Sequence, residues 1–220
     1  MRTNKTFYFS VEGENEKWYL DHLKKLINNC EEATFNVQFV IKKDKSPLRR
    51  IKAINVPIYS KQKIPAFHIV DYESNDKEHV KQFMNILDEL KEIKTKHKSY
   101  NYKLGYSNFA FEIWLIMHKD RCLASVQDRS KYVYKINELY GTNFTYLKDN
   151  KDETTFKKLL NKISLEDVKN AVANSRCIRT YQDEIGNRPL EYKGFTYYGQ
   201  NPDLTINECI EIILKECGVM

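Results

Sequence analysis

Short runs of large apolar residues alternate with longer amphipathic stretches through the first half of the chain. Compact aromatic and β-branched runs predict strands at residues 6–11, 34–41, 65–70 and 100–104. Apolar residues at helical spacing predict helices between them, at residues 16–27, 47–54 and 75–98. Because helical crossovers of this length join parallel strands, the pattern predicts an α/β fold with a mostly parallel sheet flanked by helices.

The second half shows helical spacing and little strand character. Residues 109–117 are apolar nearly all round, and further helices are predicted at residues 130–140, 152–162, 164–175 and 206–217. A Gly- and Tyr-rich segment at residues 186–199 is predicted to be a loop. No linker-like segment separates the two halves. We therefore expect one domain, with a core of residues 1–118 and a helical and loop elaboration of residues 119–220 packed on it.

Composition excludes several classes of protein. The chain has 220 residues and is 41% hydrophobic, which is too apolar for disorder, and its longest apolar run is too short to span a membrane. The five cysteines include no C-x-x-C pair, and the first strand begins too early for a signal peptide, so we expect a cytoplasmic protein without disulfides or zinc. P-loop, dinucleotide-binding and nucleophile-elbow motifs are absent. The net charge of +6 permits a nucleic-acid partner but is also ordinary for solubility.

Acidic residues follow two of the predicted strands. Glu12 comes after the first strand, and Asp71 and Glu73 come after the third. Because the carboxyl ends of parallel strands meet at one edge of a sheet, these three carboxylates would form a cup of oxygen ligands suited to Mg²⁺ or Mn²⁺. Glu14 and Glu16 are well explained by solubility and by the positive end of the following helix. Gly13 either leaves room for a phosphate or serves only the turn from strand to helix.

Glu112 is the only charged residue within the apolar segment of residues 109–117. A buried, unpaired carboxylate would lose its charge, so Glu112 is either paired with a donor or faces a site that holds a cation. Ser107 and Asn108 supply an N-cap for this segment. His118, at its end, is either a general base or a complement to the helix dipole. His68 lies inside a strand and is expected to be a hydrogen-bonded core residue.

Two groups of residues are candidates for contacting nucleic acid. Basic residues near the carboxyl end of the second strand could hold a phosphate backbone beside the acidic cup, or could form a solvated face; they are Lys42, Lys43, Arg49 and Arg50, in a run that also includes Lys45 and Lys52. Aromatic residues of the late Gly- and Tyr-rich segment could stack on bases, form a small local core or bind a partner; they are Tyr192, Phe195, Tyr197 and Tyr198.

Four stretches of the chain resemble the RloB-like family, a branch of the Toprim fold. The first, residues 11–16 (VEGENE) followed by Trp18 and Tyr19, is similar to the family's opening strand and E-G-x-x-E motif. The second, residues 70–73 (VDYE), stands in place of the Toprim D-x-D motif. The third, residues 107–115 (SNFAFEIWL) with His118, is similar to the signature S-N-P-x-F-E-x-W-x-x-x-H, and the fourth, residues 201–205 (NPDLT), is similar to the closing N-P-x-T segment.

The resemblance implies a Toprim-like sheet whose catalytic core is residues 1–118. In that scheme Glu12 is a metal ligand or general acid/base, while Asp71 and Glu73 hold Mg²⁺ or Mn²⁺. Glu112 joins them as a catalytic residue, and the accessory residues are Glu16, Ser107, Asn108 and His118. Two departures stand out: Glu73 replaces the second Asp of D-x-D, and Phe109 replaces a Pro.

Toprim domains occur in enzymes that make or break phosphodiester bonds. Since no topoisomerase tyrosine and no primase accessory domain is identifiable, the resemblance implies a metal-dependent nuclease acting on RNA (tRNA included) or DNA. RloB-like proteins resemble effectors of anti-phage or abortive-infection loci, and the implied partner is an ABC/AAA-type ATPase encoded nearby. The rival hypotheses are a non-catalytic subunit that docks on that ATPase and a plain nucleic-acid-binding module. The oligomeric state stays open, with a homo-oligomer among the alternatives.

Overall fold

The computed structural model describes residues 2–54, 63–121, 124–145 and 152–220. Its central sheet has five strands in the order β2-β1-β3-β4-β7, and β5 and β6 form a separate hairpin. The strands are β1 (Asn4–Val11), β2 (Asn36–Lys43), β3 (Ile64–Asp71), β4 (Tyr100–Asn108), β5 (Leu190–Tyr192), β6 (Phe195–Tyr197) and β7 (Asp203–Leu204). β1 to β4 pair in parallel and β7 is antiparallel to β4, so the prediction of a mostly parallel α/β sheet is confirmed.

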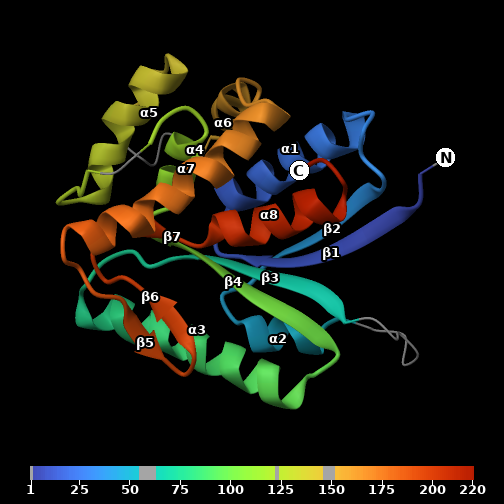
Figure 1. The fold of residues 1–220 in the computed structure, drawn as a ribbon, viewed down its shortest axis with the longest axis horizontal. Helices are drawn as coiled ribbons and strands as arrows, with labels where there is room; N and C mark the ends of the chain where they lie inside the picture. Colours follow the sequence, from blue (N-terminus) through green and yellow to red (C-terminus); the bar gives the residue numbers. More distant parts are fainter. Residues whose placement is uncertain (1, 55–62, 122–123, 146–151) are drawn as a thin grey trace.

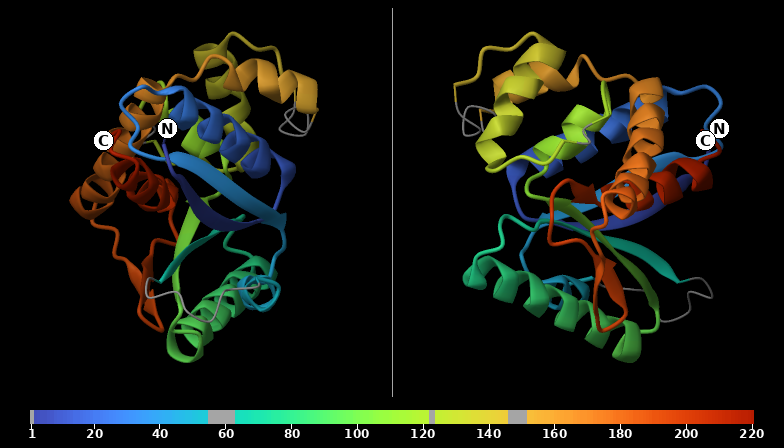
Figure 2. Two further views of the ribbon diagram at one scale, coloured as in Figure 1. Left: turned by 90° about the vertical axis from the view of Figure 1, so that its right-hand side faces the viewer. Right: turned by 60° about the vertical axis from the view of Figure 1, so that its left-hand side comes forward.

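Helices cover both faces of this sheet. They are α1 (Glu14–Asn29), α2 (Pro47–Lys52), α3 (Lys77–Lys96), α4 (Glu112–Met117), α5 (Tyr132–Tyr140), α6 (Glu153–Leu160), α7 (Leu165–Glu184) and α8 (Ile206–Glu216), with a short 3₁₀ helix η1 (Arg129–Lys131) before α5. α2 and α3 lie on one face together with the β5–β6 hairpin, whereas α1, α8 and the outer helices α4 to α7 lie on the other (Figures 1 and 2). Each helix predicted from the sequence is present, and α7 is longer than predicted.

Strand alternation divides the apolar side chains between two cores. Phe7, Phe9 and Val11 of β1 face the larger core beneath α1 and α8, while Tyr8 packs against the smaller core beneath α2 and α3. α8 lies very close to β4 at Gly105, where a Cβ atom would sit 3.3 Å from the Cα of Ile206. The larger core includes residues from both sides of position 118. The boundary proposed at that position stays a prediction.

A buried hydrogen-bonded cluster joins β1, β3 and β4 on the face of the sheet that α2 and α3 cover. Ser10 Oγ lies 2.6 Å from His68 Nδ1 and 2.7 Å from the hydroxyl of Tyr102. Burial lowers the pKa of His68 to about 3, which keeps its imidazole neutral. The prediction that His68 is a hydrogen-bonded core residue is therefore confirmed.

Two local predictions are wrong. Ser107 and Asn108 do not cap a helix: they are the last residues of β4 and pair with Leu204 and Asp203 of β7, and α4 begins only at Glu112. The N-cap pattern failed because sheet pairing with a strand far along the chain competes with local capping. In this way β4 extends four residues beyond its predicted end.

The Gly- and Tyr-rich segment is also not a simple loop. Its β5 and β6 strands are joined by Lys193 and Gly194, which both have positive φ angles (49° and 82°), as two-residue hairpin turns require. Phe195 and Tyr197 are buried in the smaller core against α3. These rings are therefore core residues and are not available to stack on bases.

Among the described residues, no helix is both long enough and apolar enough to cross a lipid bilayer. Four cysteines are free thiols, namely Cys30, Cys177, Cys209 and Cys217. Cys122 lies outside the described residues.

Candidate functional site

Acidic side chains from four elements gather at the carboxyl edge of the parallel strands. Val11 is in register with Ile69, so the chain beyond β1 and the end of β3 emerge at the same edge. One cavity of about 400 Å³ at this edge is lined by the five carboxylates of Glu12, Glu16, Asp71, Glu73 and Glu112, and also by Glu14, whose carboxylate is paired with Lys43. The structure thus brings the four predicted catalytic carboxylates together and adds Glu16 to them.

The segment after β3 turns sharply instead of continuing as a strand. Glu73 adopts a left-handed backbone conformation with φ of 64°, and the Ser74 amide donates to the Tyr72 carbonyl at 2.9 Å. The Glu73 amide donates to the Phe109 carbonyl at 2.9 Å, which ties this turn to the chain that leads into α4. The turn therefore positions Glu73 beside the loop that carries Glu112.

Burial and mutual repulsion raise the pKa values of two of these carboxyl groups. The pKa of Glu16 rises to about 7, mainly through burial and then through the charges of Glu112 and Glu12, although the backbone N–H groups of Glu16 and Gly13 oppose the rise. The pKa of Asp71 is raised well above its usual range by burial and by the four neighbouring carboxylates. The site as it stands holds more negative charge than it can stabilise.

Glu16 is buried in the site, so its explanation as a solvated helix-start residue is wrong, whereas the family resemblance named it as an accessory site residue. It is only 5% exposed, and within the described residues its Oε2 atom is buried without a hydrogen-bond partner. A solvated helix-start residue would have neither property. The periodicity of α1 gave a usable signal, since Glu16 precedes the buried Tyr19, Leu20 and Leu23 by three, four and seven positions.

Gly13 makes room for that carboxylate. A Cβ atom at this position would lie 2.6 Å from Glu16 Oε2, and the φ angle of −121° is one that any residue adopts. Gly13 lies in the turn from β1 to α1, as one of its two predicted roles requires, and its role in leaving space for a phosphate stays a prediction. A glycine is needed at position 13 because the Glu16 carboxylate occupies the space that a side chain at this position would fill.

Three cationic or imidazole groups border the carboxylates. The Lys45 ammonium forms an ion pair with Glu12 Oε1, and Lys43 Nζ lies 3.1 Å from Glu14 Oε1. On the opposite rim, His79 Nε2 lies 3.1 Å from Glu73 Oε2. The ion pair with Glu12 raises the pKa of Lys45 above its usual value. His79 was not among the predicted site residues, and Lys45 was predicted only as a member of the basic run that could lie beside the acidic cup, because local sequence does not indicate which distant carboxylate either residue contacts.

The predicted nucleic-acid-binding residues have different positions. Lys42 is exposed at the end of β2, Lys43 lines the acidic cavity, and Arg49 is exposed with its guanidinium held by Asp44 at 2.9 Å. Arg50 is only 6% exposed and donates to the carbonyls of Phe9 at 3.2 Å and Val40 at 3.0 Å. The prediction is therefore wrong for Arg50, which faces inward and joins α2 to β1 and β2.

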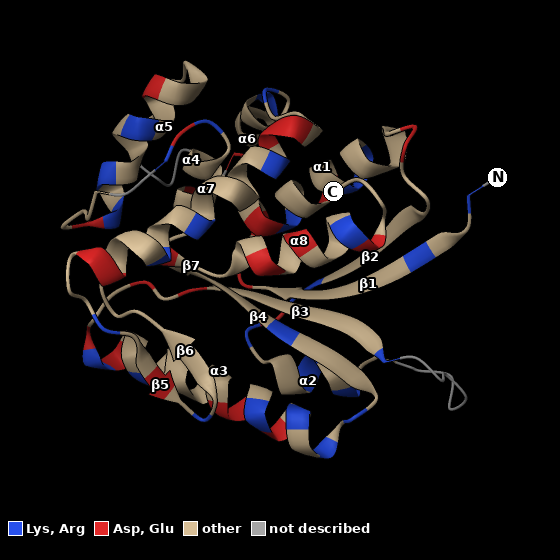
Figure 3. Cartoon of the chain, in the orientation of Figure 1, with Lys and Arg blue, Asp and Glu red and all other residues tan. Residues whose placement is uncertain are grey.

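Charges elsewhere on the surface are mixed. Blue and red alternate along α3 in Figure 3, and Lys94 lies 3.9 Å from the centre of the Phe195 ring. Lys96 is paired with Glu92 at 3.2 Å. The lysines near the end of α3 are therefore part of a mixed, solvated face.

His118 is a structural residue of the larger core. It is 1% exposed, and its ring nitrogens lie 3.0 Å from the Tyr19 hydroxyl and 2.8 Å from the Trp114 carbonyl. Burial lowers its pKa to about 4, so it carries no charge with which to complement the helix dipole at neutral pH. It does not line the acidic cavity, and neither interpretation offered for it from the sequence applies.

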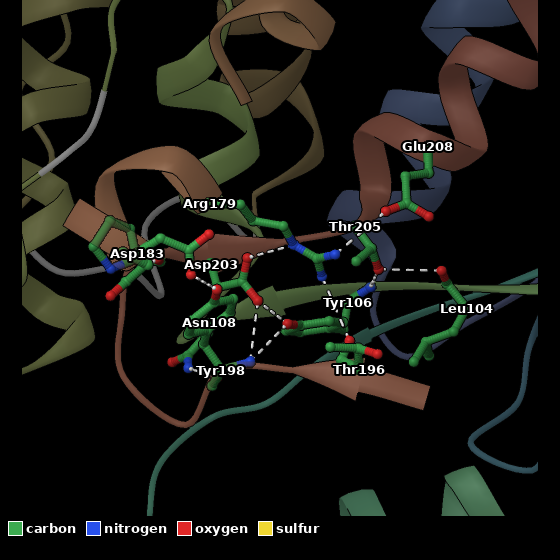
Figure 4. A network of polar contacts seen from close by, with 12 residues as sticks. Leu104, Tyr106, Asn108, Arg179, Asp183, Thr196, Tyr198, Asp203, Thr205 and Glu208 are labelled. Carbon is green, nitrogen blue, oxygen red and sulfur yellow. Dashed lines mark hydrogen bonds and ion pairs between the residues drawn. The ribbon is translucent and has the colours of Figure 1, made fainter. Parts of the chain in front are cut away.

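Asn108, another of the accessory residues, belongs to a buried polar network behind the site (Figure 4). Asp203 is fully buried and accepts hydrogen bonds from the Tyr106 hydroxyl, from Arg179 Nε at 3.3 Å and from the Tyr198 amide at 3.2 Å. Asn108 Nδ2 donates to the Tyr198 carbonyl at 2.9 Å. Burial raises the pKa of Asp203 to about 8. The network joins the end of β4 to β7 and α7.

Asn201 extends this support to the rim of the cavity. Its side-chain amide accepts from the Val126 amide at 2.7 Å and donates to the Val126 carbonyl at 2.9 Å. The segment fixed in this way leads directly to Arg129, which lines the acidic cavity. Asn201 and Asp203, the first and third residues of the closing NPDLT segment, thus have structural roles that the sequence did not indicate.

The donor set fits a hard divalent cation. All five carboxylates offer oxygen ligands, two have raised pKa values that a cation would reverse, and Glu16 presents a buried oxygen without a partner. In the side-chain positions of the described residues, no three His, Cys, Asp or Glu groups are arranged to hold a metal ion. Binding would therefore require carboxylates such as Glu12 to change rotamer.

Comparison with known proteins identifies the family. A family model described as RloB-like protein matches residues 7–213, nearly the whole chain, and the protein therefore belongs to the RloB-like family. No curated protein matches the chain. No solved structure matches it either.

The inward position of Arg50 predicts a difference between neighbouring arginines. Arg50→Met should lower the free energy of unfolding by about 1–3 kcal/mol, because the carbonyls of Phe9 and Val40 lose their buried donor. Arg49→Met is the matched control and should change stability little, since its ion pair is exposed. Chemical denaturation of the three proteins tests this, and equal losses in both variants would contradict the placement of Arg50.

The raised pKa of Glu16 predicts a pH dependence of stability. Between its usual pKa of 4.5 and the folded value of about 7, the folded protein binds a proton that the unfolded chain releases. Stability from this group is therefore present at low pH and lost as pH rises through that window. Relative to Glu16→Gln, the wild type should lose up to about 3 kcal/mol between roughly pH 5 and pH 8.

Denaturation in EDTA at several pH values measures that difference. Glu14→Gln is the control, because Lys43 lowers the pKa of the exposed Glu14 carboxyl and no loss on raising the pH is expected from it. Parallel pH profiles for the wild type and Glu16→Gln would show that Glu16 is not protonated in the folded protein.

Proposed function

We propose that this RloB-like protein is a divalent-metal-dependent nuclease that cleaves phosphodiester bonds of RNA or DNA. The observation that carries the proposal is the convergence of five carboxylates on one open cavity at the carboxyl edge of a parallel sheet. Mg²⁺ and Mn²⁺ prefer such oxygen donors and usually keep positions for water and substrate phosphate. The resemblance of the four sequence stretches to a Toprim-type site supports the same activity.

The protein's own groups would have separate roles. Glu12, Asp71 and Glu73 would hold the metal, which when bound supplies charge stabilisation at the scissile phosphate and a more acidic water. Glu16 Oε2 is buried beside them without a hydrogen-bond partner, and its carboxylate would accept a proton from the attacking water once a bound cation has reversed the rise of its pKa. Lys43 and Arg129 line the cavity, where their charges would attract the phosphate backbone.

The biological setting is proposed from the family resemblance. In it the nuclease is a cytoplasmic effector of anti-phage defence by abortive infection, released or positioned by an ABC/AAA-type ATPase encoded nearby. A second candidate function is a non-catalytic subunit that docks on the same ATPase. It is favoured by the present side-chain positions, in which no three of the described acidic groups are arranged to hold an ion.

Cleavage of total RNA, tRNA and plasmid DNA by the purified protein tests the proposal. We expect cleavage in Mn²⁺ or Mg²⁺ that EDTA abolishes, and a loss on the order of 10²-fold or more in Glu12→Gln and in Asp71→Asn, because each removes charge from the metal site. The matched control is Glu14→Gln, which changes the carboxylate that is paired with Lys43 at the start of α1 and should keep most of the activity.

Two other outcomes are informative. Activity that survives in both Glu12→Gln and Asp71→Asn would mean that the acidic cavity is not the active site. If no substrate is cleaved with or without the partner ATPase, and Mn²⁺ does not bind, the non-catalytic subunit becomes the better description.

A further inference from the structure

We propose that the Lys45 ammonium occupies the cation position at Glu12 in the metal-free protein and moves to a substrate phosphate when a divalent ion binds. The inference rests on the proposed function, which it deepens by naming how metal binding and substrate binding are coupled at that site. The sequence places Lys45 in a basic run that could hold a phosphate backbone or form a solvated face, and it indicates neither the contact with Glu12 nor an exchange with a metal ion.

The loop that carries Lys45 is held in place on both sides. The Asp44 amide donates to the Val11 carbonyl at 3.0 Å, which fixes the end of β2 against the end of β1. The Asp44 carboxylate accepts from the Ser46 amide at 3.0 Å. Lys45 therefore projects from a fixed backbone position directly beside Glu12.

Lys45 stands between two cavities that meet at the carboxylates. It lines the acidic cavity, and it also lines an adjoining cavity of about 350 Å³ that shares Glu12, Asp71 and Glu73 and extends towards α2 and α3. Its ammonium contacts Glu12 Oε1 and also feels the charge of Glu73. A short movement of this side chain would thus take it from one cavity to the other.

The ion pair is of a kind that a metal can displace. The Lys45 side chain is 69% exposed against 20% for Glu12, so water and salt screen the ammonium end of the pair and limit its contribution to stability. A divalent cation carries twice the charge and would interact with five carboxylates, including the buried, unpartnered Oε2 of Glu16. Both cations need the same Glu12 carboxylate, so binding of the metal excludes the ammonium from it.

The displaced ammonium would lie at the edge of the metal site. Substrate phosphate is expected there, because a bound Mg²⁺ or Mn²⁺ takes substrate oxygens into its open positions. A lysine on a flexible stem binds phosphate as a point charge. Metal binding would therefore convert Lys45 from a counterion of the protein into a phosphate-binding group.

Metal affinity of the free protein tests the first half of the proposal. Protein freed of metal with EDTA and then dialysed is titrated with Mn²⁺, and free Mn²⁺ is followed by electron paramagnetic resonance. Lys45→Met should bind Mn²⁺ about three- to tenfold more tightly than the wild type, because no ammonium competes for Glu12. Lys43→Met removes the same charge from the same rim, where Lys43 is paired with Glu14, and should change the affinity by less than about twofold.

Nucleic-acid binding tests the second half of the proposal, the movement of Lys45 to a substrate phosphate. Anisotropy of a labelled single-stranded oligonucleotide, measured with Ca²⁺ and with EDTA, should show metal-enhanced binding in the wild type. Lys45→Met should lose most of that enhancement, whereas Lys45→Arg, which keeps the charge, should retain it.

The outcomes separate this inference from the proposed function. The exchange at Glu12 would be overturned if the wild type and Lys45→Met bound Mn²⁺ with equal affinity. It would also be overturned if Lys45→Met and Lys43→Met raised the Mn²⁺ affinity equally. Neither result would contradict the proposed metal site. Binding of Mn²⁺ by neither the wild type nor Lys45→Met would overturn both. Metal-enhanced oligonucleotide binding that survives in Lys45→Met would overturn the transfer of Lys45 to phosphate.

Discussion

Repulsion among carboxylates held at one edge of the sheet is the constraint on which the site depends. Parallel pairing brings the ends of β1 and β3 to the same edge, and the first turns of α1 and α4 add Glu16 and Glu112 to it. Burial removes much of the water that would screen these charges, so the pKa values of Glu16 and Asp71 rise. A fold that maintains such a cluster needs either bound protons or a bound cation.

The supporting structure keeps the carboxylates from spreading apart. Asp203 and Asn108 join the end of β4 to β7, and the backbone of the turn at Glu73 is bonded to Phe109 in the chain that leads to α4. Asn201 fixes the segment before Arg129 in the same region. The SN and NPDLT stretches are nearly a hundred residues apart, yet they form one contiguous framework behind the cavity. Their resemblance to family motifs therefore reflects support of the site as much as chemistry in it.

Two kinds of cation can neutralise the negative charge of the carboxylate cluster. Lys45 already contacts Glu12 from an exposed position, and a hard divalent ion would suit the remaining oxygen donors better because of its higher charge. If the ion replaces Lys45 at Glu12, the ammonium is released to bind a phosphate. The excess negative charge of the site would in this way promote the binding of a negatively charged nucleic acid.

The sequence by itself determined the order and type of the main elements and the positions of Glu12 and Asp71 at strand ends. These features depend on local composition and spacing, which the chain displays directly: a compact aromatic run in β1, helical spacing in α3, and the capping box of Ser164 and Asp167 at the start of α7. The tertiary structure alone decided that Glu16 and Arg50 are buried and that Ser107 and Asn108 pair with β7. It also decided that Lys45 contacts Glu12. Each of these outcomes depends on which distant segment covers or pairs with a residue, and local spacing carries no information about that partner.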